Sequence, residues 1–427
     1  MIRSFRSRLV PLLILPLAAA GDDPSAGVVL GLAIIYLAAL IMGELAVRIG
    51  QPAVLGELVA GVILGNLELF GIAGLDFVAE NPGIDLLARI GVLILLFEVG
   101  LESTVPQMLA VGGRSLATAV IGVVVPFGLG WLAGAWLVPD ASEYAHAFIG
   151  ATLAATSVGI TARVLKDLGQ SQTRESRIIL GAAVIDDVLA LVILAVVTGV
   201  ITAANAGTEM GLCPVVAIVA KSVGFLVVAV VIGRWVAPQA LYQAARLRAR
   251  GAALAVSLAI CFFTAYLAYW IGLAPIIGAF AAGLVIDSAN NYKPFVERGD
   301  HSIEELLHPL LQALVPVFFV LMGMRTDLRA FTDPTVLLLA AFLTAAAIIG
   351  KLVAGFGAGS GVNRVAVGIG MVPRGEVGLI FANIGLGLTV AGAVVVPPTL
   401  YSAIVVMVIM TTMVTPPGLK WAFGRRA

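Results

Sequence analysis

The sequence predicts an all-α polytopic membrane protein, and three observations carry that prediction. The chain of 427 residues is 60% hydrophobic and only 12% charged, which is about half the charge of a soluble globular protein. Many separate apolar runs reach about 18 residues, the length at which a helix spans a bilayer. These runs are continuous rather than alternating, which argues against a transmembrane β-barrel.

Thirteen apolar segments after residue 25 are expected to be transmembrane helices. Short connections join them, and glycine is abundant at 48 residues, as expected where helix backbones approach closely in lipid. The expected spans are 26–47, 53–72, 84–103, 114–137, 144–166, 178–204, 213–233, 251–271, 273–290, 307–325, 334–356, 364–391 and 397–419.

Residues 1–25 are expected to be a signal peptide or, alternatively, an extra N-terminal helix. Arg3, Arg6 and Arg8 precede a short apolar run, and three alanines at 18–20 follow it. This order of charge, apolar run and small residues is typical of a cleavable secretory signal. A run of about 12 residues is also too short to span a bilayer comfortably, so a signal peptide is the favoured interpretation.

The distribution of Lys and Arg predicts how the chain is oriented. Loops with Arg48, Arg114 and residues 246–250 are basic, as is the C-terminal end, whereas the alternate loops are mostly acidic or uncharged. The positive-inside rule therefore places the C-terminus in the cytoplasm and residue 25 outside the cell inner (plasma) membrane. One outer loop departs from the pattern, because it carries Arg325 and Arg329 together with two aspartates.

An internal repeat is visible in the glycine pattern. The segment GELVAGVIL starts at Gly56 and GAFAAGLVI starts at Gly278, an offset of 278 − 56 = 222, while Gly100 and Gly323 are offset by 323 − 100 = 223. The matching segments are seven spans apart, and an odd separation sends the two copies through the membrane in opposite directions. Inverted repeats of this kind are typical of secondary transporters, whose sites lie near the midplane where the repeats meet.

Two adjacent acids, Asp186 and Asp187, lie inside an apolar span. An ionisable residue at bilayer depth is costly, so it is functional by default. From residue 178 the two acids lie roughly 12–14 Å into a core of about 30 Å. Neighbouring side chains point about 100° apart, so one acid can face an aqueous cavity and the other a neighbouring helix. Lys351, at similar depth in 334–356, is the expected partner; the alternative is a lysine that extends its ammonium to the interface.

Two other spans carry helix-breaking or polar residues at the depth of the aspartates. Thr156 and Ser157 lie in one, and Pro373, Gly375 and Glu376 lie near the position offset by 222 in the other. Broken helices are tolerated at this depth only where they are buried in protein or line a cavity. Their carbonyl groups and helix ends can then bind cations. For the two hydroxyls alone, bonding back to their own helix is an equal alternative.

The charges beside this second interruption, Arg374 and Glu376, are expected to support the broken helices more than to bind the ion. They can pair with each other or with charges on other helices.

Several functional classes are disfavoured by what the sequence lacks. A net charge of zero gives no reason to expect nucleic acid, and no GxxxxGK loop suggests coupling to ATP. No His or Cys pair has zinc spacing, and no cofactor or enzymatic activity is expected. An intramembrane aspartyl protease needs its two aspartates on opposed helices. A cation channel and a solute symporter remain as alternatives, although neither a filter-like loop nor a solute pocket is visible.

Five segments resemble, in order, signatures of the second cation/proton antiporter family, the bacterial sodium/proton and Kef-type exchangers. They are QPAVLGELVAGVILG, LILLFEVGLE, ATSVGITARVLKDLG, PVFFVLMGM and MVPRGEVGLI. The resemblance covers residues 26 to 419. The pair Asp186–Asp187 is similar to that of the electrogenic sodium/proton members. Kef-type potassium members usually carry Gln-Asp there and a nucleotide-binding domain, and the sequence shows neither.

The resemblance implies a homodimer that exchanges Na⁺ or Li⁺, or alternatively K⁺, for H⁺ by alternating access. It implies that Asp187 carries the transported ion, with Thr156 and Ser157 beside it, and that Asp186 pairs with Lys351. A carboxylate that holds either a cation or a proton, but not both, gives obligatory exchange. If the lysine pair contributes a second proton, transport is electrogenic at two protons per sodium.

The resemblance also divides the chain into a dimer domain and a moving core domain. The expected parts are 26–112 and 251–330 for the dimer domain, 113–204 and 331–427 for the core domain, and 205–250 for a linker helix.

Overall fold

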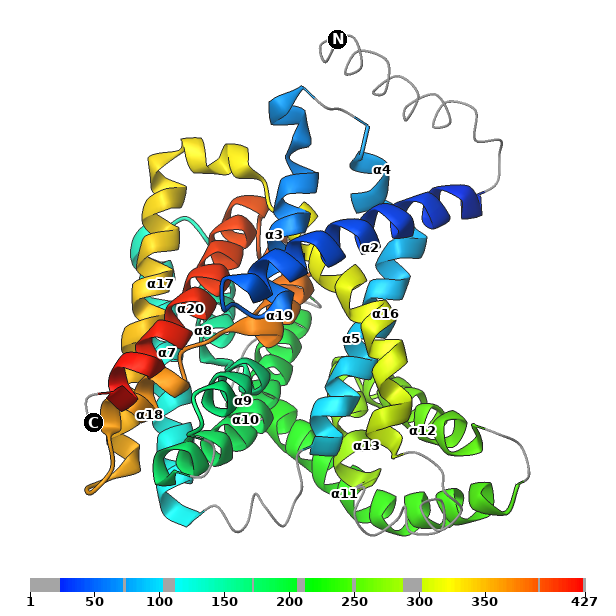
Figure 1. The fold of residues 1–427 in the computed structure, drawn as a ribbon. Coiled ribbons are helices and arrows are strands. Elements are labelled where there is room, and N and C mark those ends of the chain that lie inside the picture. The colour runs from blue at the N-terminus through cyan, green and yellow to red at the C-terminus, as the bar shows by residue number, and fades with distance from the viewer. Residues whose placement is uncertain are drawn as a thin grey trace.

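A computed structural model describes residues 24–71, 74–102, 112–170, 173–205, 212–247, 251–286, 302–390 and 392–424, and nearly all of them are helical (Figure 1). Eight helices in these ranges are long and apolar enough to cross a membrane. The prediction of a polytopic helical membrane protein is therefore confirmed. The expected signal peptide, apart from residues 24 and 25, lies outside the described residues.

The helices before residue 206 follow the expected apolar segments closely. They are α2 (Pro24–Arg48), α3 (Ala53–Gly65), η1 (Leu67–Phe70), α4 (Asp76–Ala79), α5 (Pro82–Glu102), α7 (Gly112–Leu137), α8 (Glu143–Ala154), α9 (Val158–Asp167) and α10 (Arg174–Asn205).

The helices after residue 211 complete the bundle. They are α11 (Leu212–Arg246), α12 (Ala252–Trp270), α13 (Pro275–Ile286), α16 (Ile303–Met324), η2 (Leu328–Thr332), α17 (Pro334–Ala354), η3 (Gly355–Ala358), α18 (Arg364–Gly370), α19 (Gly375–Leu386) and α20 (Pro398–Gly424).

Helix α11 continues to Arg246, well past the expected end at residue 233, and a second difference from the expected elements lies after α19. The span expected to reach residue 391 ends at Leu386, and a two-stranded antiparallel hairpin follows, with β1 (Thr389–Val390) and β2 (Ala393–Val394). Gly392, with φ of +83°, lies between the strands in a conformation that glycine adopts without strain. The β-branched residues here favour strands, although an apolar run this short reads equally well as helix.

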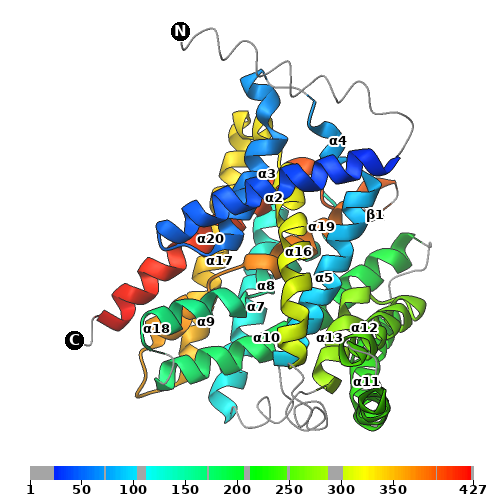
Figure 2. The same cartoon turned by 45° about the vertical axis from the view of Figure 1, so that its right-hand side comes forward.

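The helices pack in two groups. The first group contains α2, α3, α5, α12, α13 and α16, and the second contains α7, α8, α9, α10, α17, α18, α19 and α20. Both views keep α5 and α13 on the opposite side from α17 and α20 (Figures 1 and 2). Helix α10 packs against α7 of the second group and also against α11, which in turn packs on α12 and α13.

Glycine lets helix backbones touch in both groups. In the first group a Cβ on Gly61 would lie 2.8 Å from the Gly323 Cα atom. In the second, a Cβ on Gly350 of α17 would lie 2.8 Å from Pro126 of α7. Close approach of small residues is what binds helices to one another in lipid. The α7–α17 contact places α7 beside the helix that carries Lys351.

Candidate ion-binding site

The two adjacent aspartates lie near the middle of α10, a helix of 32 residues. Asp186 is completely buried, whereas Asp187 keeps 5% of its surface exposed. Leucine, isoleucine, valine and alanine surround both acids in the sequence, so the helix continues without interruption through the charged pair. The structure thus gives the two neighbours different surroundings, with the small residual exposure on Asp187.

Asp186 meets a lysine from another helix. Lys351 of α17 donates from Nζ to Asp186 Oδ1 at 2.8 Å, and both side chains are 0% exposed. A Cβ on Gly122 of α7 would lie 3.4 Å from this Nζ, so the lysine packs against α7 at a position without a side chain. The ammonium is therefore directed into the protein rather than toward the membrane interface. Lys351 is also close enough to Asp187 to be attracted by its charge.

Two helices of the second group are interrupted beside this pair. Helix α8 ends at Ala154 and α9 begins at Val158, with Ala155 in an extended conformation. Likewise α18 ends at Gly370 and α19 begins at Gly375. Each interruption exposes backbone donors and acceptors that lack a partner in their own helix.

The two interruptions bond to each other. The Ser157 amide donates to the Pro373 carbonyl oxygen at 2.8 Å, and the Thr161 hydroxyl donates to the Gly370 carbonyl oxygen at 2.7 Å. A Cβ on Gly375 would lie 2.6 Å from the Ser157 side chain. Only glycine at 375 therefore allows the two broken segments to approach this closely.

Thr156 lies between the crossing and the acid pair. Its hydroxyl faces the Met371 carbonyl oxygen at 3.4 Å and lies within hydrogen-bonding range of the Asp186 carboxylate. It is completely buried, as is Ser157. The crossing and the Asp186–Lys351 pair therefore form one connected polar site.

Arg374 binds a carbonyl group at the first interruption and another on α17. Its guanidinium donates to the Ala155 carbonyl oxygen at the C-terminal end of α8, and to the Ala347 carbonyl oxygen on α17 at 3.4 Å. The C-terminal end of a helix carries partial negative charge, so a buried guanidinium there is favourably placed. Arg374 also interacts with the charge of Asp186. The side chain of Glu376 lies outside what the structure describes.

The structure thus brings Asp186, Lys351, Thr156 and Arg374 into one cluster, with Ser157 at its edge. Sequence reasoning missed Gly122, which accommodates the lysine, and the Ala155 carbonyl group, which Arg374 binds. No local signal identifies either residue, because glycine and alanine are common throughout these helices. Within the described ranges, no three His, Cys, Asp or Glu side chains are grouped so that they could hold a metal ion.

Comparison with known proteins agrees with this architecture. The model of a family described as "sodium/hydrogen exchanger, transmembrane" matches residues 31–424. The solved structure of the sodium/proton antiporter MjNhaP1 from Methanocaldococcus jannaschii is similar, with a TM-score of 0.69 at 15% identity over 93% of this chain and 97% of that one. The fold is therefore that of a sodium/proton antiporter.

Two curated relatives match over nearly the whole chain, and a third matches over part of it. The high-affinity Na⁺/H⁺ antiporter NhaS3 of Synechocystis is 38% identical, covering 93% of this chain and 90% of that protein. The Na⁺/H⁺–K⁺ antiporter GerN of Bacillus cereus is 36% identical, covering 92% and 96%. The potassium-efflux protein KefC of Salmonella arizonae is 32% identical, and the match spans 73% of this chain and 48% of KefC.

These matches confirm the resemblance seen in the signature segments, and they identify a transporter rather than an enzyme. The chain belongs to the transmembrane sodium/hydrogen exchanger family.

Proposed function

We propose that this chain exchanges Na⁺ or Li⁺ for H⁺ across the bacterial plasma membrane. The observation that carries the proposal is the buried Asp186–Lys351 pair next to Asp187, at the crossing of two interrupted helices. An Asp-Asp pair at bilayer depth suits a small cation and a proton as the two substrates. Relatives named as Na⁺/H⁺ antiporters, NhaS3 and GerN among them, favour sodium. GerN and KefC support K⁺ as the alternative cation.

Asp187 is the proposed carrier of either ion. It keeps 5% exposure where Asp186 has none, so it is the acid that a hydrated ion can reach. A dehydrated Na⁺ needs several oxygen ligands, which Thr156, Ser157 and backbone carbonyl groups of the interruptions can supply. A carboxylate that binds Na⁺ or H⁺ in turn gives exchange when the site alternates between the two sides of the membrane.

Asp186 and Lys351 are proposed to handle a second proton. When Na⁺ arrives beside Asp187, its charge competes with the ammonium for the neighbouring Asp186 carboxylate. Loss of the ion pair leaves a buried ammonium without its counter-ion, which favours release of its proton. The cycle then moves two protons for each Na⁺, so transport carries net charge.

An inverted repeat and 13 spans are also proposed, and glycine contacts support the repeat. Under offsets of 222 (283 − 61) and 223 (323 − 100), the contact of Gly61 with Gly323 corresponds to the contact of Gly283 with Gly100, and a Cβ would collide with the facing backbone in each. A second pair of glycine contacts has the same offset. A Cβ on Gly56 would meet the Met42 carbonyl group, and a Cβ on Gly278 would meet the Thr264 carbonyl group, where 278 − 56 and 264 − 42 both equal 222.

The second group is the proposed moving core, and the first group is the proposed dimer domain, with α11 between them. In this scheme 113–204 and 331–427 move, 26–112 and 251–330 are fixed in a homodimer, and 205–250 connect them. Alternating access by movement of one bundle against another is common where inverted repeats build a transporter.

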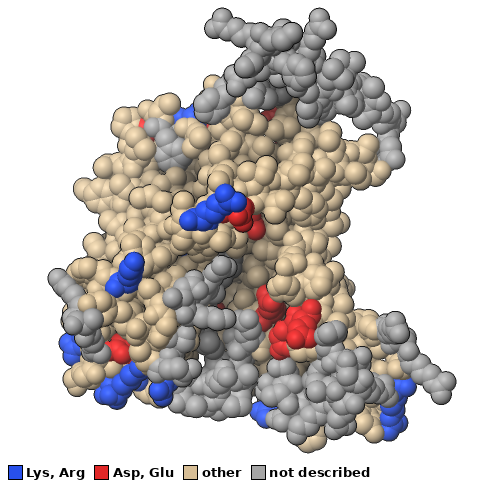
Figure 3. All heavy atoms as spheres, in the orientation of Figure 1, with Lys and Arg blue, Asp and Glu red and all other residues tan. Residues whose placement is uncertain are grey.

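The proposed orientation places the C-terminus in the cytoplasm. In Figure 3, Lys and Arg gather along the lower edge of the molecule, and the broad surface above that edge carries few charges. The positive-inside rule makes that edge the cytoplasmic side. The ends of α5, α16 and α19 that carry Asp85, Met324 and Leu386 then face outward.

The test is cation-induced dissipation of a pH gradient in inside-out vesicles. Na⁺, Li⁺ and K⁺ are added in turn to vesicles with the wild type and with Asp187→Asn. We expect a response to Na⁺ and Li⁺ that Asp187→Asn abolishes. A response to K⁺ alone would keep the site and change the cation. An undiminished response in the variant would place the ion site elsewhere.

A further inference from the structure

Arg325, at the C-terminal end of α16, connects the two helix groups on the proposed outer side. Its guanidinium donates to Asp85 Oδ1 of α5 at 2.6 Å and to Asn383 Oδ1 of α19 at 2.7 Å. Asp85 also accepts from Arg89 Nε at 2.6 Å. The bond to Asp85 stays within the first group, whereas the bond to Asn383 crosses to the second.

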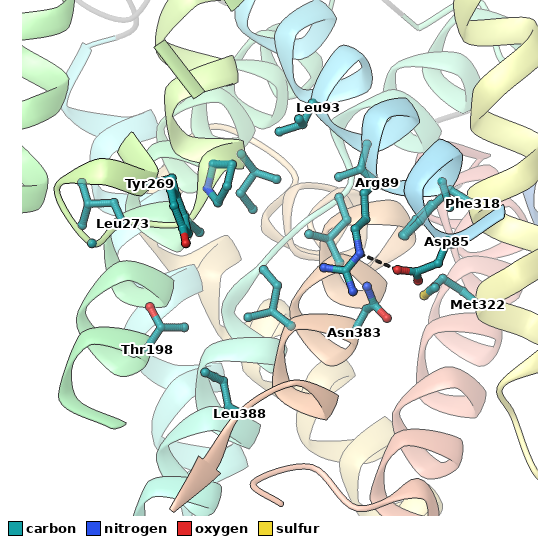
Figure 4. Close-up of a pocket in the computed structure, with 18 of the residues that line it drawn as sticks. Asp85, Arg89, Leu93, Thr198, Tyr269, Leu273, Phe318, Met322, Asn383 and Leu388 are labelled. Carbon is teal, nitrogen blue, oxygen red and sulfur yellow. Dashed lines mark hydrogen bonds and ion pairs between the residues drawn. The ribbon is translucent and has the colours of Figure 1, made fainter. Parts of the chain in front are cut away.

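A cavity of about 550 Å³ lies between the groups beside these side chains. Its walls are mostly apolar and come from both groups, with Leu93 and Phe318 from the first and Leu388 following α19 of the second. Figure 4 shows Asp85, Arg89 and Asn383 together at one end of the cavity. A movement of one group against the other would change the width of this space.

Helix α19 links the ion site to this contact. Its first residue, Gly375, packs against Ser157 at the helix crossing, and Asn383 lies eight residues farther along the same helix. At about 1.5 Å per residue the two points are about 12 Å apart on one rigid element. A displacement of the ion site therefore also displaces Asn383, while Arg325 is held in the first group by the Asp85 carboxylate.

We propose that Arg325 and Asn383 form a clasp that is closed in one state of the transport cycle and open in the other. Asp85 and Arg89 are positioning residues that keep the guanidinium in place. The inference rests on the proposed movement of the second group against the first. A neutral amide is a weaker acceptor than a carboxylate, so the contact that crosses the groups is the one suited to repeated opening.

The test measures the distance between the groups by pulsed EPR in liposomes. Spin labels are attached at Leu86 of α5 and Leu337 of α17, which are 59% and 52% exposed, after Cys213 and Cys261 are replaced by alanine. We expect two distances whose proportions change with Na⁺. Asn383→Ala should lower the ratio of clasped to open molecules about tenfold, as expected for loss of one hydrogen bond to a charged group.

Asn383→Asp should shift the same ratio in the opposite direction, because a carboxylate binds the guanidinium more strongly. A loss of folding cannot mimic opposite shifts. The matched control is Asn205→Ala, which removes a 3.3 Å bond from Asn205 Nδ2 to the Thr389 hydroxyl. This bond joins α10 to β1 without touching the first group, so the ratio should not change.

Each outcome decides between the clasp and the movement on which it rests. Distances that respond to Na⁺ but not to either Asn383 variant would overturn the clasp and leave the movement intact. A single distance, insensitive to Na⁺ and to Asp187→Asn, would overturn both. Shifts of equal size in Asn205→Ala would show a general loosening of the outer side and contradict the clasp.

Discussion

Two ion pairs in this molecule have nearly the same length and very different surroundings. Lys351 and Asp186 are 2.8 Å apart and both are 0% exposed, whereas Arg325 and Asp85 are 2.6 Å apart and are 24% and 22% exposed. The first pair joins two helices of one group, and the second supports a contact between groups. The distance between charges therefore says little about their role, which depends on burial and on the helices that the pair connects.

Burial decides how strongly each pair resists being broken. Charges in a low-dielectric interior attract each other strongly, but they also lose their hydration, so a buried pair is stable only while both partners remain. A partly exposed pair keeps much of its hydration and is screened by salt. The buried Asp186–Lys351 pair is thus suited to breaking when another cation competes for the carboxylate. The outer Asp85–Arg325 pair is suited to holding the guanidinium of Arg325 in place.

The largest expected effect is that of Lys351→Ala. Removal of one partner leaves a buried carboxylate uncompensated, which should lower the free energy of unfolding by about 3–5 kcal/mol. Thermal unfolding of the purified protein measures the loss. The double variant Asp186→Leu/Lys351→Met is the control, because replacement of both charges should restore most of the stability. Unchanged stability in Lys351→Ala would contradict the pair.

The next effect is that of Gly375→Ala at the crossing of the broken helices. The new methyl group would lie 2.6 Å from the Ser157 side chain, and forcing the segments apart should cost about 1–3 kcal/mol and reduce transport. Gly128→Ala on α7 is the matched control, since nothing lies within 4 Å of its Cβ position. Equal losses in unfolding temperature and transport for the two variants would argue against a tight crossing.

The smallest effect is expected at the outer pair. Asp85→Asn should lower the free energy of unfolding by about 1 kcal/mol or less, and the difference should shrink as salt is added. Glu44→Gln, which breaks the exposed pair of Glu44 with Arg48 within α2, is the control and should have less effect. If Asp85→Asn destabilised the protein as much as Lys351→Ala, burial would not distinguish the two regions.

The sequence predicts much of the fold because the bilayer imposes a simple length rule on each helix. The apolar runs located the spans, and the costly charges within them located Asp186, Asp187 and Lys351. The offset of 222 leads from Ser157 to residue 379, which lies within α19 and close to the second interruption, although Ser157 and Pro373 are more than 200 residues apart.

The details that the sequence did not predict depend on how distant backbones meet. The bond from Ser157 to the Pro373 carbonyl group and that from Arg374 to the Ala155 carbonyl group use main-chain atoms, which every residue has. The Arg325–Asn383 contact depends on a single amide in a helix whose other residues, apart from Glu376, are apolar. The sequence predicts helix where the hairpin after α19 lies, because a short apolar run fits both conformations.

The central claim is that Asp187 holds either a sodium ion or a proton. Sodium binding to the purified protein, measured by calorimetry across a pH series, tests this most directly. Competition with one proton weakens the apparent affinity up to tenfold for each unit of falling pH, and competition with two weakens it further. We predict such a dependence in the wild type and no sodium binding in Asp187→Asn. Affinity that stays constant across the series, or survives in the variant, would contradict the account.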